Sequence, residues 1–275
     1  MVKAQSLPGF KPSRYIYRGR EGWTHPLKGE DIAYFVDNSS PYTYLDRGFE
    51  ILITPTPNTQ TNVMKLFLDT AIVSDIEERV STGLIDGITT NPTLIRKSGR
   101  DPWKVYTDII ELGVEDLSIE VNGDTSKELI ANAVAVNKNY GNVATIKLPC
   151  TVEGLKACKY LSNIGLRVNM TLVFTVSQAI LCSLAGASYV SPFIGRMDDN
   201  SLDGIKLIND ISNIYASNGV KTKVLAASVR DVQSVGVAFG VGADICTIPP
   251  KVFDNMASHV LTDKGLEQFN RDFKG

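Results

Sequence analysis

The chain has 275 residues, of which 43% are hydrophobic and 21% are charged, and its formal net charge is −2. This composition is typical of a globular protein with one large or two small α/β domains, and the near-zero charge gives no support for nucleic-acid binding. The chain has only two histidines, which argues against zinc hydrolases and against Ser-His-Asp or Cys-His catalysis, because each of these requires a positioned imidazole.

The first 63 residues differ from the rest of the chain. They hold five of the ten tyrosines among prolines, glycines and charged residues, with little helical periodicity. One apolar run at residues 49–54 is compatible with a strand, and the segment TPTPNTQTN that follows has the composition of a linker. Met64, directly after it, would serve as a protein start. Residues 1–63 are therefore either an upstream segment or an arm that packs elsewhere, and we assign them no function.

From Met64 onward, short apolar runs recur with starts roughly 20–35 residues apart. They predict eight strands, at residues 66–69, 87–90, 117–121, 143–148, 167–174, 189–194, 223–227 and 244–248.

Helix signals lie between these runs. Three capping boxes are expected, at Ser74-x-x-Glu77, Thr125-x-x-Glu128 and Thr175-x-x-Gln178, and Asp101 precedes a first-turn proline. Helix ends are expected at Gly113, Gly141, Gly165, Gly186 and Gly219. One apolar stripe at helical spacing is formed by Leu202, Ile205, Ile208 and Ile211.

Alternating buried strands and helices predict a parallel sheet, and eight such units predict a closed (β/α)8 TIM barrel over residues 64–275. An open doubly wound sheet is the alternative, although no GxGxxG follows any strand. Leu266, Phe269 and Phe273 predict an additional C-terminal helix with an apolar edge, of the kind that often packs on a neighbouring subunit.

Polar side chains gather where these strands end, which is where reactive groups lie in such barrels. Lys147 is the most informative, because a lysine inside an apolar strand is rare. Its structural interpretation is a buried ion pair with Glu120 or Asp69. Its functional interpretation is an amine desolvated enough to lose its proton and attack a carbonyl, with the two carboxylates as acid/base groups.

Ser228 and Arg230 follow the seventh predicted strand, a recurrent phosphate seat in barrels, and Arg196 follows the sixth. These residues predict an anion site, against the alternative that two arginines without a motif are solvated surface.

The four cysteines form no CxxC pair and the N-terminus lacks the apolar stretch of a signal peptide, so we expect reduced thiols and a cytoplasmic protein. No apolar run has the length of a membrane-spanning helix, so we expect no membrane contact.

The strand-end segments, in this order, resemble those of the transaldolase family, in particular the short subfamily that includes fructose-6-phosphate aldolases. The matching segments are LFLDTA, GITTNPTL, TIKLP, VNMTLVFT, SPFIGRMDD and LAASVR, and the resemblance runs from about Met64 to the C-terminal helix.

The resemblance implies a role for each candidate residue. Lys147 would form the Schiff base and Asp69 would take and return the proton of the substrate hydroxyl, while Glu120 and Thr171 would hold the relay water. Residues that would bind the dihydroxyacetone part of the substrate are Thr89, Asn91, Asn169, Ser191 and Phe193. Residues that would bind its phosphate are Arg196, Ser228 and Arg230.

Two positions distinguish activities within the resembling family. The aldolases typically have Gln at the position of Glu120 and Tyr at that of Phe193, so both residues favour a transaldolase that passes a dihydroxyacetone unit from a ketose phosphate to an aldose phosphate. The alternatives are an aldolase that releases free dihydroxyacetone and a non-catalytic sugar-phosphate-binding barrel.

The resemblance also implies sugar-phosphate substrates and a homo-oligomer, often of ten subunits. The imine is itself the electron sink, so we expect neither a metal ion nor an organic cofactor.

Overall fold

The computed structural model describes residues 43–46, 49–52 and 64–274. The chain divides into two units, Met1–Thr61 and Asn62–Gly275. In the first unit, β1 (Thr43–Asp46) pairs antiparallel with β2 (Phe49–Leu52). The strand predicted at 49–54 is thus present up to Leu52, and its last two residues lie outside the described part. The division at residues 63 and 64 stays a prediction.

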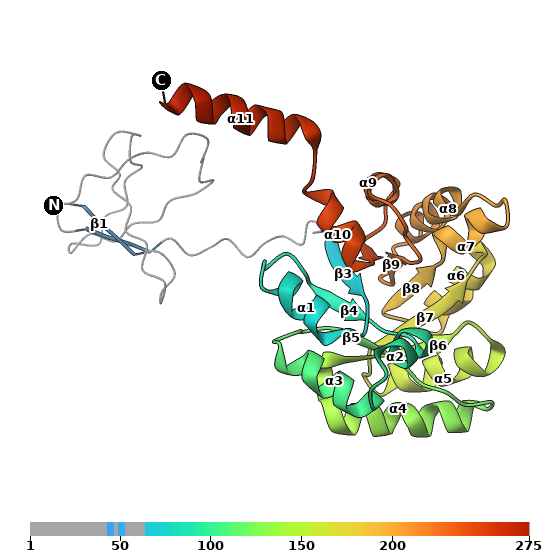
Figure 1. Ribbon diagram of the computed structural model, residues 1–275. Coiled ribbons are helices and arrows are strands. Elements are labelled where there is room, and N and C mark those ends of the chain that lie inside the picture. The colour runs from blue at the N-terminus through green and yellow to red at the C-terminus, as the bar shows by residue number, and fades with distance from the viewer. Residues whose placement is uncertain (1–42, 47–48, 53–63, 275) are drawn as a thin grey trace. The chain divides into compact units, whose positions relative to one another are not determined.

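The second unit is built on a closed barrel of eight parallel strands (Figure 1). The strands are β3 (Lys65–Asp69), β4 (Gly87–Thr89), β5 (Leu117–Glu120), β6 (Ala144–Pro149), β7 (Val168–Val173), β8 (Tyr189–Pro192), β9 (Lys223–Ala226) and β10 (Ile245–Ile248). Each strand pairs with the next along the chain, and β10 pairs with β3 to close the sheet. The predicted TIM barrel is confirmed, and the open doubly wound sheet is wrong.

Helices between the strands form the outer layer of this barrel (Figure 1). They are α1 (Val73–Val80), α2 (Pro92–Ser98), α3 (Pro102–Glu111), α4 (Ser126–Tyr140), α5 (Val152–Asn163), α6 (Val176–Leu184), α7 (Ile194–Asp199), α8 (Gly204–Ser217) and α9 (Val232–Gly240), with a 3-10 turn at Gly141–Val143. Two further helices, α10 (Pro250–Met256) and α11 (Val260–Lys274), follow the last strand.

The capping boxes at Thr125 and Thr175 are confirmed, and so is the cap at Asp101. The box predicted at Ser74 is wrong. The first turn of α1 begins before it, because the Ile76 amide already donates to the Ile72 carbonyl at 3.2 Å.

The predicted glycine helix ends all have positive φ, a backbone conformation that glycine adopts without a steric penalty. The apolar stripe predicted on α8 is partly wrong. Ile208 and Ile211 are buried, whereas Leu202 precedes the helix and is exposed.

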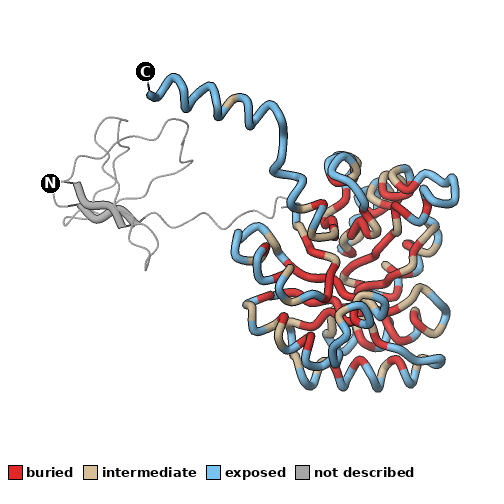
Figure 2. The backbone as a smooth tube through the Cα atoms, viewed as in Figure 1, coloured by how far each residue is buried: buried red, intermediate tan, exposed pale blue. Residues whose placement is uncertain are grey.

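Two hydrophobic clusters fill the barrel unit. The larger lies between the strands and the helices, and Figure 2 shows buried residues along the strands with exposed residues on the outer sides of the helices. The smaller is the barrel interior, where Phe67 packs edge-on against Tyr189 with ring centroids 6.3 Å apart. Because side chains alternate along a strand, residues on either side of each interior residue face the helices.

The predicted C-terminal helix is present as α11, and none of its residues is buried. Its exposed apolar side chains include Leu266, Phe269 and Phe273. Among the described residues, no helix combines the length and the apolar character needed to cross a bilayer.

Candidate active site

Strand alternation places the polar side chains inside the barrel. On β6, Ile146 and Leu148 belong to the cluster beneath the helices, so Lys147 between them points to the interior. On β7, Val168 and Met170 face the helices in the same way. Asn169 and Thr171 therefore point inward, as does Ser191 on β8, and all three are buried.

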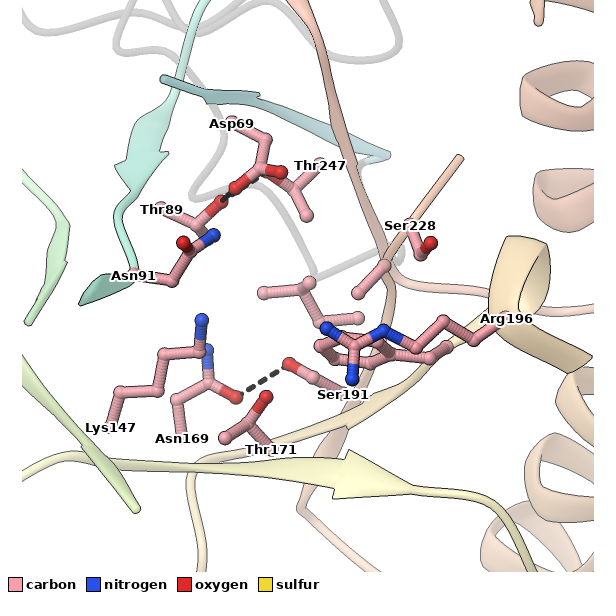
Figure 3. Close-up of a pocket in the computed structure, with 13 residues that line it drawn as sticks. Asp69, Thr89, Asn91, Lys147, Asn169, Thr171, Ser191, Arg196, Ser228 and Thr247 are labelled. Atoms are coloured by element: carbon pink, nitrogen blue, oxygen red, sulfur yellow. Dashed lines mark hydrogen bonds between the residues drawn. The ribbon is translucent and has the colours of Figure 1, made fainter. Parts of the chain in front are cut away.

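These side chains line a cavity of about 130 Å³ at the C-terminal end of the barrel (Figure 3). The lining residues are Asp69, Thr89, Asn91, Lys147, Asn169, Thr171, Ser191, Phe193, Arg196, Leu225, Ala227, Ser228 and Thr247. All the residues predicted from the sequence are in this set except Glu120 and Arg230.

Lys147 is only 5% exposed. Its Nζ donates to the carbonyl oxygen of Thr90 at 3.0 Å and lies 3.4 Å from Oε2 of Glu120. In Figure 3 the nitrogen faces the cavity that Asn91 and Asn169 also line. A buried amine with one carbonyl and one carboxylate beside it keeps a further position for a ligand in the cavity.

Asp69 ends β3 on another side of the cavity. Its Oδ1 accepts a hydrogen bond of 2.8 Å from the Thr89 hydroxyl, which lies 2.6 Å from the hydroxyl of Thr247. Burial raises the pKa of the Asp69 carboxyl above its usual value, while the Lys147 charge and the Thr89 hydrogen bond act in the opposite direction. A carboxyl with a raised pKa in the same cavity as a buried amine is suited to proton transfer.

Asn169 and Ser191 are held together by a hydrogen bond of 2.6 Å from the serine hydroxyl to Oδ1 of the amide. The Asn169 Nδ2 donates to the Ser118 hydroxyl at 3.2 Å. Next to them, the buried Thr171 Oγ1 is the one buried side-chain nitrogen or oxygen atom without a hydrogen-bond partner among the described residues. An unpaired buried hydroxyl in a polar cavity is suited to hold water or a ligand hydroxyl.

The outer rim of the cavity combines an aromatic ring with a cation. Phe193 packs against Phe174, with ring centroids 5.9 Å apart, and the Arg196 guanidinium lies 4.9 Å from the centre of the Phe193 ring. Ser228, on the same rim, has a φ of +58°, which is unusual for a residue with a side chain. Its carbonyl accepts a hydrogen bond from the Gly195 amide at 3.1 Å, so this strained residue fixes the start of α7.

Glu120 and Arg230 lie outside the cavity lining. Glu120 reaches Lys147 but lines a separate groove, with Tyr106 and Trp103 among its other residues. Arg230 makes a two-pronged ion pair with Asp199. Arg230 stands beside the cavity, engaged with a carboxylate.

Sequence reasoning missed Thr247. It lies on β10, whose Cys246 and Ile248 face the helices, so its hydroxyl points into the cavity. A threonine inside an otherwise apolar run was the available signal, and it is the same signal that pointed to the other strand-end residues.

Comparison with known proteins places the chain in a family. The sequence profile described as "Transaldolase/Fructose-6-phosphate aldolase" matches residues 66–275. The chain belongs to this family.

Relatives in three bacteria, each called "Probable transaldolase", support the assignment. The protein of Symbiobacterium thermophilum is 48% identical over 211 residues, which cover 77% of this chain and 97% of the relative. The Paracoccus denitrificans protein is 48% identical over 210 residues, covering 76% and 96%, and that of Lactiplantibacillus plantarum is 47% identical over 211 residues, covering 77% and 97%.

Among solved structures, the thiamine phosphate pyrophosphorylase of Pyrococcus furiosus is 15% identical with a TM-score of 0.47, covering 70% of this chain and 93% of its own. The family profile and the three bacterial relatives identify the chain as an enzyme of the transaldolase type.

Proposed function

We propose that the protein is a Schiff-base transaldolase. Lys147 condenses with the ketone of a ketose phosphate such as sedoheptulose 7-phosphate or fructose 6-phosphate, and the resulting three-carbon unit is passed to an aldose phosphate. The observation that carries the proposal is the buried Lys147 amine, which has Glu120 at 3.4 Å and shares a cavity with Asp69, in a chain of this family.

Imine formation begins with attack of the Lys147 nitrogen on the substrate carbonyl. The carbinolamine then loses its hydroxyl as water, and this step requires a proton donor close to the nitrogen. We assign that role to a water molecule held by Glu120 and Thr171. The unpaired Thr171 hydroxyl and the position of Glu120 beside Lys147 support this assignment.

Carbon–carbon cleavage follows from the iminium ion. Asp69 accepts the proton of the hydroxyl on the carbon that becomes the aldehyde, and the bonding electrons move into the imine to give an enamine. Addition to the acceptor aldehyde reverses these steps, and Asp69 returns the proton. The raised pKa of Asp69 supports a group that both takes and returns a proton.

Substrate binding is assigned to the two ends of the cavity. Asn91, Asn169 and Ser191 line the same cavity as the Lys147 side chain and are assigned to the hydroxyls of the dihydroxyacetone unit (Figure 3). Arg196 and Ser228 on the rim are assigned to the phosphate. Arg230 would join them after exchanging its Asp199 partner for phosphate oxygens, because both anions suit the same guanidinium edge.

Phe193 favours transfer over release of the three-carbon unit. Its ring lines the cavity and offers no proton, so the enamine waits for an aldehyde acceptor. We expect Phe193→Tyr to increase release of free dihydroxyacetone from fructose 6-phosphate without an acceptor. A Phe193→Leu variant, which removes the ring without adding a hydroxyl, is the control, and equal release by both variants would refute this role.

Borohydride reduction in the presence of fructose 6-phosphate, followed by peptide mass mapping, tests the proposal. We expect a reduced three-carbon adduct on Lys147 and none in Lys147→Arg. Lys223→Arg is the matched control, because Lys223 begins β9 at the opposite end of the barrel. A wild-type protein that binds the sugar phosphate but yields no adduct would identify a binding protein instead.

We also propose that the protein works as a homo-oligomer in the cytoplasm. The exposed Leu266, Phe269 and Phe273 of α11 support association, and the four free cysteines suit a reducing compartment. Light scattering of the purified chain, compared with a chain ending before α11, tests the association. A monomeric full-length chain would contradict it.

A further inference from the structure

Two thiols lie together directly behind the strand that carries Lys147. Cys150 follows β6 and Cys182 lies on α6, and their Sγ atoms are 3.6 Å apart. Both are free, and although they are 32 positions apart in sequence, the fold brings the β6–α5 loop and α6 together at their sulfurs. Formation of a disulfide requires the sulfurs to approach to about 2.05 Å, a closure of roughly 1.5 Å.

The two thiols have complementary environments. Cys150 is partly exposed, whereas Cys182 is fully buried. The hydrogen bond from Cys182 lowers the pKa of the Cys150 thiol against the effect of partial burial, and the same bond together with burial raises the pKa of Cys182. Cys150 is therefore the accessible nucleophile, and Cys182 is placed to complete a bond with it.

We propose that Cys150 and Cys182 are a hydroperoxide-reactive site, and that the disulfide they form slows the chemistry at Lys147. The Cys150 thiol gives up its proton, and the resulting thiolate attacks the terminal hydroxyl oxygen of a hydroperoxide. The O–O bond breaks to give a sulfenic acid, and the leaving oxygen takes up the proton from Cys150 to become an alcohol, or water if the oxidant is hydrogen peroxide. The Cys182 sulfur then attacks the sulfenic sulfur, and the S–O bond breaks. The hydroxide that leaves takes the Cys182 proton to become water, so two thiols are oxidised by two electrons and one peroxide is reduced.

The backbone links this site to the catalytic cavity. The Cys150 amide donates to the carbonyl of Thr171 at 2.9 Å, and Thr171 is paired with Pro149 in the register of β6 and β7. Thr171 carries the unpaired hydroxyl of the cavity, and Lys147 lies three residues before Cys150. A displacement of Cys150 therefore acts on two residues that line the cavity.

The loop between β6 and α5 is packed too closely to absorb such a displacement. A Cβ added at Gly154 would lie 2.0 Å from the Pro149 carbonyl oxygen, so the first turn of α5 already rests on the end of β6. The approach of Cys150 to Cys182 would move the end of β6 and α5 together. A misplacement of about 1 Å at a catalytic group is sufficient to reduce turnover about 100-fold.

The test is treatment of the full-length protein with hydrogen peroxide, followed by peptide mapping without reductant and by transaldolase assay. We expect a Cys150–Cys182 peptide, a loss of turnover of about 10- to 100-fold, and recovery with dithiothreitol. Cys150→Ser and Cys182→Ala should retain turnover under the same treatment. Cys158→Ala is the matched control, since Cys158 is buried on α5 and burial raises its pKa to about 12, and this variant should respond like the wild type.

Absence of the cross-linked peptide in the oxidised wild type would overturn the proposal, and so would a cross-linked protein with unchanged turnover. Peptide mapping of the oxidised wild type, together with the recovery of turnover with reductant, tests the proposal even if a cysteine variant fails to fold. The activity part rests on the proposed function, which the borohydride adduct on reduced protein tests separately. The cross-linked peptide is measured whether or not the chain turns over sugar phosphates.

Discussion

Replacement of Thr89 by valine tests the coupling between the threonine pair and Asp69. An ionised Asp69 only accepts hydrogen bonds, so the Thr89 proton points to Asp69, and the Thr247 hydroxyl must donate to Thr89. Valine keeps the shape of the side chain and removes the donor. A hydrogen bond to a charged group contributes about 1.5–3 kcal/mol, so we expect kcat to fall about 10- to 150-fold.

The same replacement should move the acid limb of the kcat profile to higher pH. The Thr89 hydrogen bond lowers the pKa of Asp69, and without it the effect of burial is opposed by Lys147 alone. Steady-state rates across pH measure both effects. Thr247→Val is the matched control, because it leaves the bond to Asp69 intact and removes a neutral bond of about 0.5–1.5 kcal/mol. An acid limb at the same pH in Thr89→Val as in the wild type would refute the reasoning. A larger fall in kcat in Thr247→Val than in Thr89→Val would also refute it.

Three further predictions concern stability. The folded-state pKa of Asp69 is raised, so above the usual Asp pKa the folded state binds more protons than the unfolded state, and stability falls as pH rises through that window. Asp69→Asn should therefore gain stability relative to the wild type as pH rises. A difference in the free energy of unfolding between the two proteins that stays constant with pH in urea titrations would contradict this. Asp116→Asn should lower the free energy of unfolding by about 2–3 kcal/mol with little change in kcat, because the buried carboxylate accepts hydrogen bonds from Thr145, Arg167 and Tyr189 at the N-terminal end of the strands. A thermal melt and a rate assay check the two effects. Gly154→Ala should lower the free energy of unfolding by about 1–3 kcal/mol and also lower turnover, because its Cβ would displace the Pro149 carbonyl, two residues from Lys147. Wild-type stability in a thermal melt together with wild-type turnover would be inconsistent with the close contact.

Local patterns in the sequence were sufficient to predict the strands of the barrel. Short apolar runs at regular spacing predicted the bounds of all eight strands to within a residue or two. Such a run indicates a buried strand by its own residues, so it can be recognised without knowing which strands lie next to it. The cap at Asp101 and the boxes at Thr125 and Thr175 were equally predictable, since a capping bond joins residues only three apart. Lys147 stood out for the same reason, as a charge inside an apolar strand.

The tertiary structure decided which polar groups meet. Thr247 approaches Thr89 across 158 residues, Arg230 is held by Asp199, and Cys150 in the β6–α5 loop meets Cys182 on α6. The start of α1 before Ser74 likewise depends on how the chain leaves β3. These contacts are fixed by strand register and by the direction in which each strand end turns, and both arise only when the sheet closes. The sequence by itself therefore determined the strands and the candidate groups, and barrel closure determined which of those groups share a hydrogen bond, a cavity or a thiol pair.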